Sequence, residues 1–202
     1  MTLPPSIRIF FAIDLPPVVK DKMKSFMLAL KKRAKTNAIR WTKPENLHIT
    51  LQFLPSVTSS DLPDLIGRVR GRLMEQVEQT VIAFGHLHLF PSAFHPRVIV
   101  LDITPQQLLA DLSSQIGKGI EEAGYQIEDR PFKAHLTIGR IKNMHLDLGF
   151  LSEFTLPAIE PIVVNKVVMF RSEPMPDGSH YTPLDEVLLD SRVSFPSSQP
   201  PY

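Results

Sequence analysis

The sequence predicts an α+β protein with two pseudo-symmetric lobes, whose antiparallel sheets line a central cleft and whose helices cover the outer faces. Two observations support this fold class. A strand-like run that ends in aspartate and is soon followed by proline occurs at residues 8–14 and again at 97–102, and two His-apolar-Thr-apolar strings begin at His48 and His135. Asp102 follows Asp14 by 88 positions, and His135 follows His48 by 87. The repeat predicts two similar lobes that place the two strings opposite one another.

The first half of the chain reads as strand, helix, strand, helix. Residues 7–15 are short, apolar and rich in β-formers, and they stop at Pro16-Pro17. Residues 18–35 carry apolar side chains at helical spacing, with lysines elsewhere around the helix. Those lysines are interpreted as a solvated face, with RNA phosphate contact as the alternative. A strand at 47–54 carries the first string, and a helix begins near Ser60-Asp61.

The second half repeats this order with additional strands. We predict strands at 80–89 and 97–104, a helix at 105–123 closed by Gly124, and the second string in a strand at 134–141. A terminal strand pair follows at 163–171 and 181–189. We expect residues 1–190 to form a single two-lobed domain, and the Ser- and Pro-rich residues 191–202 to form a disordered tail.

Composition excludes several classes of protein. The chain has 202 residues, of which 43% are hydrophobic and 21% charged, as in an ordinary soluble globule. Its 22 Lys and Arg residues nearly balance 21 Asp and Glu, so affinity for nucleic acid must come from a local patch. The absence of cysteine excludes disulfides, thiolate nucleophiles and cysteine-ligated zinc. With no targeting or membrane segment in the sequence, we expect a cytoplasmic monomer that makes no contact with membranes.

The two strings have the chemistry of an acid and base pair. Side chains alternate along a strand, so each string presents its His and Thr on one face, His48 beside Thr50 and His135 beside Thr137. One imidazole can accept a proton from water while the other donates one to a leaving oxygen. Facing strands would place these groups on opposite sides of a strained phosphodiester, with the threonine hydroxyls near its oxygens. This chemistry requires neither a metal nor a cofactor.

Arg140 is the candidate cation for the phosphate, although strict alternation would turn it away from His135 and Thr137. Its use in the site requires a β-bulge or a strand end, and Gly139 is the residue that would permit one. The sequence therefore predicts an irregularity in this strand.

The sequence resembles the two-histidine phosphoesterases, and within them the RNA 2',3'-cyclic phosphodiesterases, historically also called 2'-5' RNA ligases. The resemblance runs from about residue 7 to 190. It rests on residues 8–16, on 41–54 with Asn46-Leu47-His48-Ile49-Thr50-Leu51, on 132–140, and on Tyr181-Thr182-Pro183-Leu184. One departure follows the first string, where the family often has Phe-Leu-Gly and this chain has Phe53-Leu54-Pro55.

The resemblance implies roles that the repeat alone cannot assign. His48 would donate a proton to the departing ribose oxygen, and His135 would activate water, giving a 2'-phosphomonoester from the 2',3'-cyclic phosphate of RNA or a nucleotide. Arg140 would bind phosphate, and Phe53 would pack on a base. Two alternatives remain open: reversible 2'-5' joining of RNA ends, and a non-catalytic RNA-binding module on the same fold.

Other candidate residues are interpreted as structural. His86 and His88 share a strand face, yet no third ligand for a metal is evident in the sequence nearby, so we interpret them as surface alternation. Trp41 and Phe132 precede the two strings and are expected to pack in the core. Tyr181 could line the cleft, but it is not placed in the predicted site.

Overall fold

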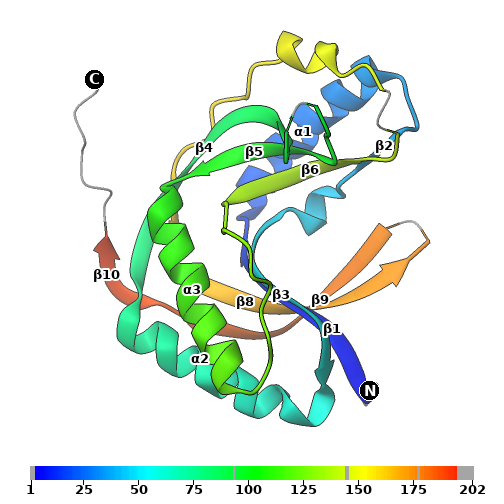
Figure 1. The fold of residues 1–202 in the computed structure, drawn as a ribbon. Helices are drawn as coiled ribbons and strands as arrows, with labels where there is room; N and C mark the ends of the chain where they lie inside the picture. The colour runs from blue at the N-terminus through cyan, green and yellow to red at the C-terminus, as the bar shows by residue number, and fades with distance from the viewer. Residues whose placement is uncertain (1–2, 93, 144–145, 177, 195–202) are drawn as a thin grey trace.

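The computed structural model describes residues 3–92, 94–143, 146–176 and 178–194. They form two sheets that lie close together at one side of the molecule and diverge toward the other (Figure 1). The first sheet has the order β3-β1-β8-β9 and the second the order β10-β4-β5-β6-β2, with β7 also pairing with β4. The pairings of the described strands are antiparallel except that of β10 with β4. The strands are β1 (Ser6–Asp14), β2 (Ile39–Trp41), β3 (His48–Thr58), β4 (Glu78–Phe90), β5 (Val98–Thr104), β6 (His135–Ile141), β7 (Ile162–Val164), β8 (Lys166–Met175), β9 (Gly178–Leu188) and β10 (Asp190–Ser194).

Three helices cover the sheets, close to the predicted positions. They are α1 (Pro17–Ala34), α2 (Leu62–Gln76) and α3 (Gln106–Glu122), with short 3₁₀ turns η1 (Pro44–Asn46), η2 (Ser59–Asp61) and η3 (Gly149–Glu153). Proline begins α1 because its missing N–H is one that the first turn leaves unpaired. The same helix ends at Lys35, which adopts the left-handed conformation and donates its N–H to the Lys31 carbonyl.

The two lobes exchange helices, so they are not consecutive halves of the chain. Helix α1 follows β1 of the first sheet but lies beside the second (Figure 1), where Arg33 binds Glu153 and Lys22 donates to the Ala158 carbonyl. Helix α3 follows β5 of the second sheet but packs on α2 and β3. Each lobe therefore depends on a helix supplied by the other half of the chain.

The predicted repeat is present in the strand register. Asp14 pairs with His48 across β1 and β3, and Asp102 pairs with His135 across β5 and β6. Both ladders then shift register at the matching place, between Phe11 and Ala12 in one and between Ile99 and Val100 in the other. The two halves therefore share their strand pairing as well as their residue pattern.

Each motif strand contains one extra residue at this shift, Leu51 in β3 and Ile138 in β6. A bulge of this kind leaves backbone groups outside the ladder. The buried Ser113 hydroxyl donates to the Leu51 carbonyl at 2.8 Å, and the Gln52 side-chain amide donates to Ser113. At the second bulge, Thr42 donates its hydroxyl to the Thr137 carbonyl and its N–H to the Ile138 carbonyl.

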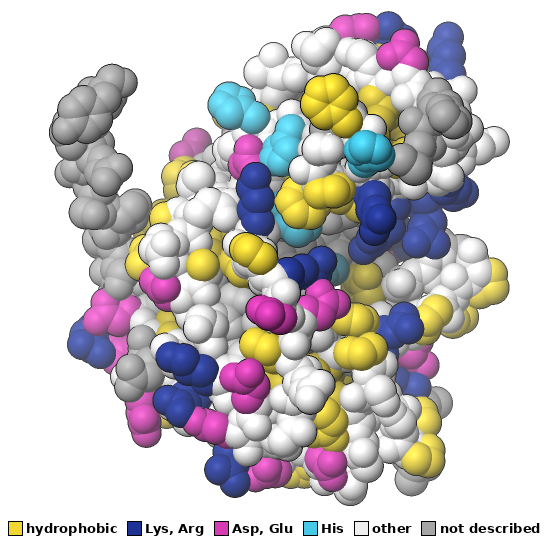
Figure 2. Space-filling view, in the orientation of Figure 1, with side chains coloured by type: hydrophobic (Ala, Val, Ile, Leu, Met, Phe, Trp, Pro, Cys, Tyr) yellow, Lys and Arg dark blue, Asp and Glu magenta, His cyan; other side chains and the backbone are white. Residues whose placement is uncertain are grey.

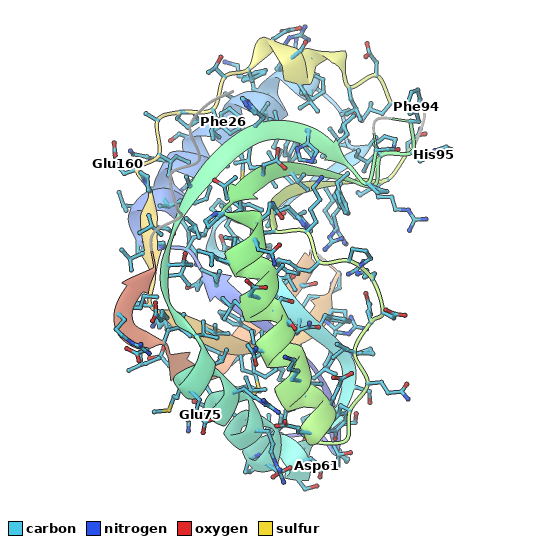
Figure 3. All side chains as sticks on the ribbon, turned by 60° about the vertical axis from the view of Figure 1, so that its left-hand side comes forward. Phe26, Asp61, Glu75, Phe94, His95 and Glu160 are labelled. Atoms are coloured by element: carbon cyan, nitrogen blue, oxygen red, sulfur yellow. The ribbon has the colours of Figure 1, made fainter. Side chains whose placement is uncertain are left out.

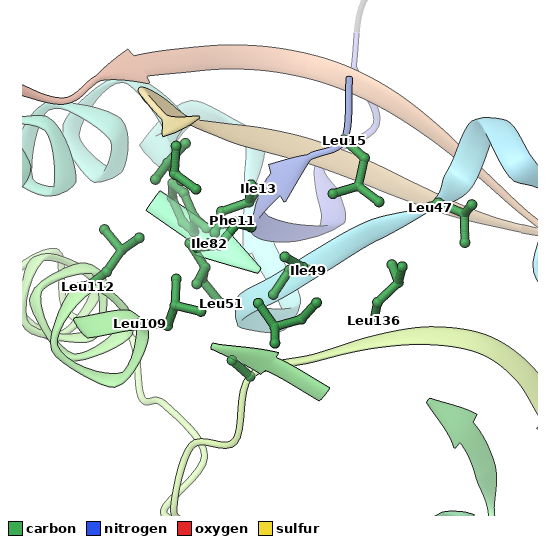
Figure 4. Packing of buried hydrophobic residues seen from close by; sticks show 14 of the residues in the cluster. Phe11, Ile13, Leu15, Leu47, Ile49, Leu51, Ile82, Leu109, Leu112 and Leu136 are labelled. Atoms are coloured by element: carbon green, nitrogen blue, oxygen red, sulfur yellow. The ribbon is translucent and has the colours of Figure 1, made fainter. Parts of the chain in front are cut away.

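The apolar residues of both strings lie in one hydrophobic cluster. Figure 4 shows Ile49 and Leu51 packed near Leu136, with Leu109 and Leu112 of α3 beside them. Because side chains alternate along a strand, burying these residues turns the neighbouring histidines and threonines to the opposite face. Trp41 and Phe132 pack against the same cluster, as predicted.

Several boundaries differ from the predictions. The run at 163–171 is divided between β7 and β8, because Asn165 leaves the ladder and its carbonyl accepts the Leu189 N–H. Strand β2 was not predicted, since three residues are too few to show a period. The predicted tail is wrong at its start: Asp190–Ser194 forms β10 on the edge of β4, and residues 195–202 lie outside the described residues. No helix of the described chain is long and apolar enough to cross a membrane.

We predict that Ser113→Ala lowers the free energy of unfolding by about 1–3 kcal/mol, because it leaves the Leu51 carbonyl without its buried donor and removes one of the two acceptors of the Gln52 amide. Urea denaturation followed by circular dichroism measures the change. Ser114→Ala, at the adjacent exposed position of α3, is the matched control. Equal midpoints for the two variants would show that the bulge does not need this hydrogen bond.

Candidate active site

His48 is held at the start of β3 with its ring orientation fixed on both sides. Its Nδ1 lies 2.6 Å from the Asn46 carbonyl, so Nδ1 carries the proton and donates it. In the neutral ring Nε2 is then the acceptor, and it lies 3.0 Å from the Thr50 hydroxyl. The rings of Phe10 and Tyr181 pack on the imidazole, with centroids 4.7 and 5.2 Å away.

His135 repeats this arrangement at the start of β6. Its Nδ1 lies 2.7 Å from the carbonyl of Lys133, also two residues earlier, and the ring of Phe90 stacks on it at 5.1 Å. Thr137 lies two residues further along the strand and shares the face of His135. Strands β3 and β6 contact each other, so the two predicted strings are brought together. Both rings therefore leave Nε2 for the reaction.

Both imidazoles are neutral in the free protein at pH 7. Burial lowers the pKa of His48 to about 4. The positive charges of Arg140 and Lys20 contribute to this lowering, whereas the hydrogen bond to the Asn46 carbonyl and the charge of Asp14 partly oppose the shift. Burial also lowers the pKa of His135, with Arg130, His88 and Arg140 contributing. The sequence predicted one neutral and one protonated ring; without a bound anion, the charged form of either ring is disfavoured.

Arg140 lies on the cleft face because of the bulge in β6. The extra residue Ile138 shifts the alternation by one, so Arg140 pairs with Val98 and returns to the face of His135 and Thr137. Its positive charge lowers the pKa of both histidines, so the guanidinium lies within electrostatic range of both rings. Gly139 does not take a left-handed conformation; a Cβ at this position would make a tight contact of 3.1 Å with the Ile39 side chain.

Phe53 occupies the position in β3 that Arg140 occupies in β6, three residues after the threonine. It pairs with Phe10 and so also lies on the cleft face. The guanidinium of Arg8 lies 5.9 Å from the centre of its ring, within the range of a cation–π contact. The aromatic side chains in contact with His48 are therefore Phe10 and Tyr181, and Phe53 lies further along the strand.

A pocket of about 230 Å³ lies beside His48 on the first sheet. Its apolar wall consists of Phe10, Phe170 and Tyr181, with the two phenylalanine rings stacked at 5.2 Å. Lys20 lies at its polar side, where Nζ bonds Asp14 at 2.6 Å and the Glu45 carbonyl at 3.0 Å. Figure 2 shows histidine and basic side chains gathered around the hollow between the two halves. The pocket has the mixed aromatic and polar lining typical of ligand sites.

An aspartate lies directly across the ladder from each histidine, and the two aspartates have different side-chain partners. Asp14 binds Lys20, whereas Asp102 binds His88, with Nδ1 and Oδ2 3.3 Å apart. The sequence predicted that His86 and His88 are alternating surface residues. His86 is exposed, whereas His88 is half-buried and paired with Asp102. No group of three or more metal-ligating side chains occurs among the residues described.

Comparison with known proteins agrees with this geometry. The profile of the family described as LigT like Phosphoesterase matches residues 13–100. A protein of Archaeoglobus fulgidus named RNA 2',3'-cyclic phosphodiesterase is 33% identical over 144 residues, which cover 71% of this chain and 77% of that protein. The chain belongs to the LigT-like phosphoesterase family. A Thermotoga maritima protein of the same name is 30% identical over 186 residues, which cover 89% of this LigT-like phosphoesterase and 94% of its relative.

Solved structures of the family share the fold. Escherichia coli LigT complexed with 3'-AMP superimposes with a TM-score of 0.73 at 22% identity, over 92% of this phosphoesterase and 99% of the other chain. The apo form gives a TM-score of 0.71 at 22% identity, over 94% and 100% of the two chains. At this identity the likeness establishes the two-lobed architecture of this LigT-like phosphoesterase.

Sequence reasoning missed most of the side chains that surround the two histidines of this phosphoesterase. Phe10, Phe170, Phe90 and Lys20 come from other strands or from α1, so no local pattern joins them to His48 or His135. The aspartates could have been found, because the repeat already aligns Asp14 with Asp102 at the offset that aligns the histidines.

We predict that the His48 ring titrates near pH 4 in the free protein, and His135 below its ordinary value of 6.5. NMR of the ring protons measures both, with His48→Gln assigning the signal. Because the folded pKa of His48 lies below the unfolded value, its contribution to stability is present above about pH 6.5 and is lost as the pH falls toward 4. A His48 midpoint at or above 6.5 would contradict the burial described here.

Proposed function

We propose that this protein hydrolyses the 2',3'-cyclic phosphate ends of RNA or nucleotides to 2'-phosphomonoesters, with residues 1–190 acting as one two-lobed unit. The observation that carries the proposal is the pair of equivalent imidazoles, each held by a backbone carbonyl at Nδ1 so that Nε2 is left for the reaction. An acid and a base that approach phosphorus from two sides are what in-line displacement needs. Two relatives named RNA 2',3'-cyclic phosphodiesterase support this choice of substrate.

The pocket beside His48 supports the assignment of donor and acceptor. Its aromatic wall of Phe10, Phe170 and Tyr181 suits a nucleoside, which would bring the ribose to the His48 side of the phosphorus. His135 Nε2 then takes a proton from water as the water oxygen bonds to phosphorus. The bond from phosphorus to the ribose 3' oxygen breaks, and His48 Nε2–H protonates that oxygen. The products are a 2'-phosphate and a free 3' hydroxyl.

Substrate binding favours protonation of His48, which takes the proton from solvent. The cyclic phosphate carries a negative charge, which favours the imidazolium form of an adjacent histidine and raises its pKa toward neutrality. The Nδ1–H bond to the Asn46 carbonyl also favours that charged form. Thr50 then releases Nε2 and turns its hydroxyl to a phosphate oxygen, as does Thr137, while Arg140 neutralises the charge that develops on these oxygens.

We predict that His48→Ala and His135→Ala each lower kcat for 2',3'-cyclic AMP by about 10²–10⁴-fold, because each removes one proton-transfer partner. The assay contains a chelator and separates products by chromatography against 2'- and 3'-phosphate standards. His86→Ala, at an exposed position of β4, is the matched control. Wild-type turnover no greater than that of the variant carrying both His48→Ala and His135→Ala would refute the proposed hydrolysis. A 3'-phosphate product would refute the donor assignment.

Arg140→Gln is expected to lower kcat about a hundredfold, since it removes a fixed charge from the transition state. Arg140→Lys should restore part of this loss, because it returns the charge without the planar fork of donors. Steady-state kinetics with 2',3'-cyclic AMP distinguishes the two variants. An effect confined to KM would show that Arg140 binds substrate and transition state equally.

A further inference from the structure

Two arginines face each other at the end of the second sheet. Arg40 of β2 is the direct ladder partner of Arg140 of β6, so both side chains lie on the same face of the sheet. That face is the cleft face, because the neighbours Ile39 and Trp41 are turned into the core beside Gly139. Both arginines are exposed. Arg40 therefore extends the phosphate site of Arg140 toward the edge strand.

The pair has no counter-charge within the described part of the chain. Neither guanidinium lies within 4.0 Å of a described carboxylate, although most other arginines of the protein have such a partner. Like charges directly opposite each other in an antiparallel ladder destabilise it. Two adjacent cations that the fold does not neutralise are suited to an anionic ligand that carries more than one charge.

An exposed aromatic side chain lies at the same end of the second sheet. Phe94 is in the loop that joins β4 and β5 just beyond the pair Phe90 and Val98, and Val98 is in turn the ladder partner of Arg140. Phe94 is 89% exposed, and Figure 3 shows it projecting from the tip of this hairpin. A phenylalanine this exposed gains little from folding, but it can stack on a base.

We propose that Arg40 and Phe94 form a subsite that binds the nucleotides preceding the cyclic end of an RNA chain. Arg140 contacts the cyclic phosphate, Arg40 contacts the next phosphate of the chain, and Phe94 stacks on a base further along. Cations that follow the backbone, combined with an aromatic platform, form the usual surface for single strands and read little sequence. The inference rests on the proposed function, because the cyclic end sets the register of the chain.

The test compares two substrates that end in the same nucleoside: 2',3'-cyclic AMP, and a six-nucleotide single-stranded RNA with a 2',3'-cyclic adenosine end. In the wild type, kcat/KM is expected to favour the RNA. Arg40→Gln and Phe94→Ala should each lower the ratio of the two kcat/KM values about tenfold. Arg40→Gln should also reduce by about one the slope of log kcat/KM for the RNA against log salt concentration. Lys118→Gln, which removes one charge from the exposed face of α3, should leave the ratio unchanged.

A second readout separates binding from a structural role. Arg40→Gln is expected to keep or raise the melting temperature, since it relieves the repulsion with Arg140. A ratio that stays at the wild-type value in both variants would overturn the inference, as would a fall that Lys118→Gln reproduces. If the wild type cleaves neither substrate, the proposed function is wrong. Fluorescence anisotropy with the 2'-phosphate RNA product then decides the inference: about tenfold weaker binding by Arg40→Gln supports it, and equal binding overturns it.

Discussion

The site depends on one structural constraint, a single extra residue placed after each His-x-Thr string. Alternation along β3 and β6 buries Ile49 and Leu136 and turns the histidines and threonines to the cleft. Without the bulge, the residue three positions after each threonine would point into the core. With it, Phe53 and Arg140 return to the cleft face. Each motif strand therefore presents its histidine, its threonine and the residue three positions later on the cleft face, while its other face is buried.

The bulges are maintained from outside their own strands. Ser113 of α3 satisfies the first, and Thr42, which follows β2, satisfies the second. Helix α3 belongs in sequence to the second repeat, and β2 to the first, so each motif strand is held by an element of the opposite half. This exchange couples the two halves of the chain, because loss of either half would leave buried backbone groups unpaired in the other.

Departures from the pseudo-twofold symmetry give the two equivalent histidines different surroundings. The partner of Asp14 is a lysine, whereas the partner of Asp102 is a histidine. The position of Arg140 in one strand is taken by Phe53 in the other, and the pocket with the aromatic wall lies beside His48. A symmetric pair could not distinguish a nucleoside from a water molecule. In the proposed mechanism, these differences define a side for the leaving group and a side for attack.

The sequence by itself determined the lobes, the two strings and the need for an irregularity before Arg140, because these follow from alternation and from a repeat visible along the chain. It placed both ends of α1 and α3 and the start of α2 within about two residues, since their apolar spacing is local. It could not determine that Ser113 and Thr42 hold the bulges, that Phe10 and Tyr181 pack on His48, or that Arg40 faces Arg140. Those contacts join residues far apart in sequence, and only the strand register and the exchange of helices decide which of them meet.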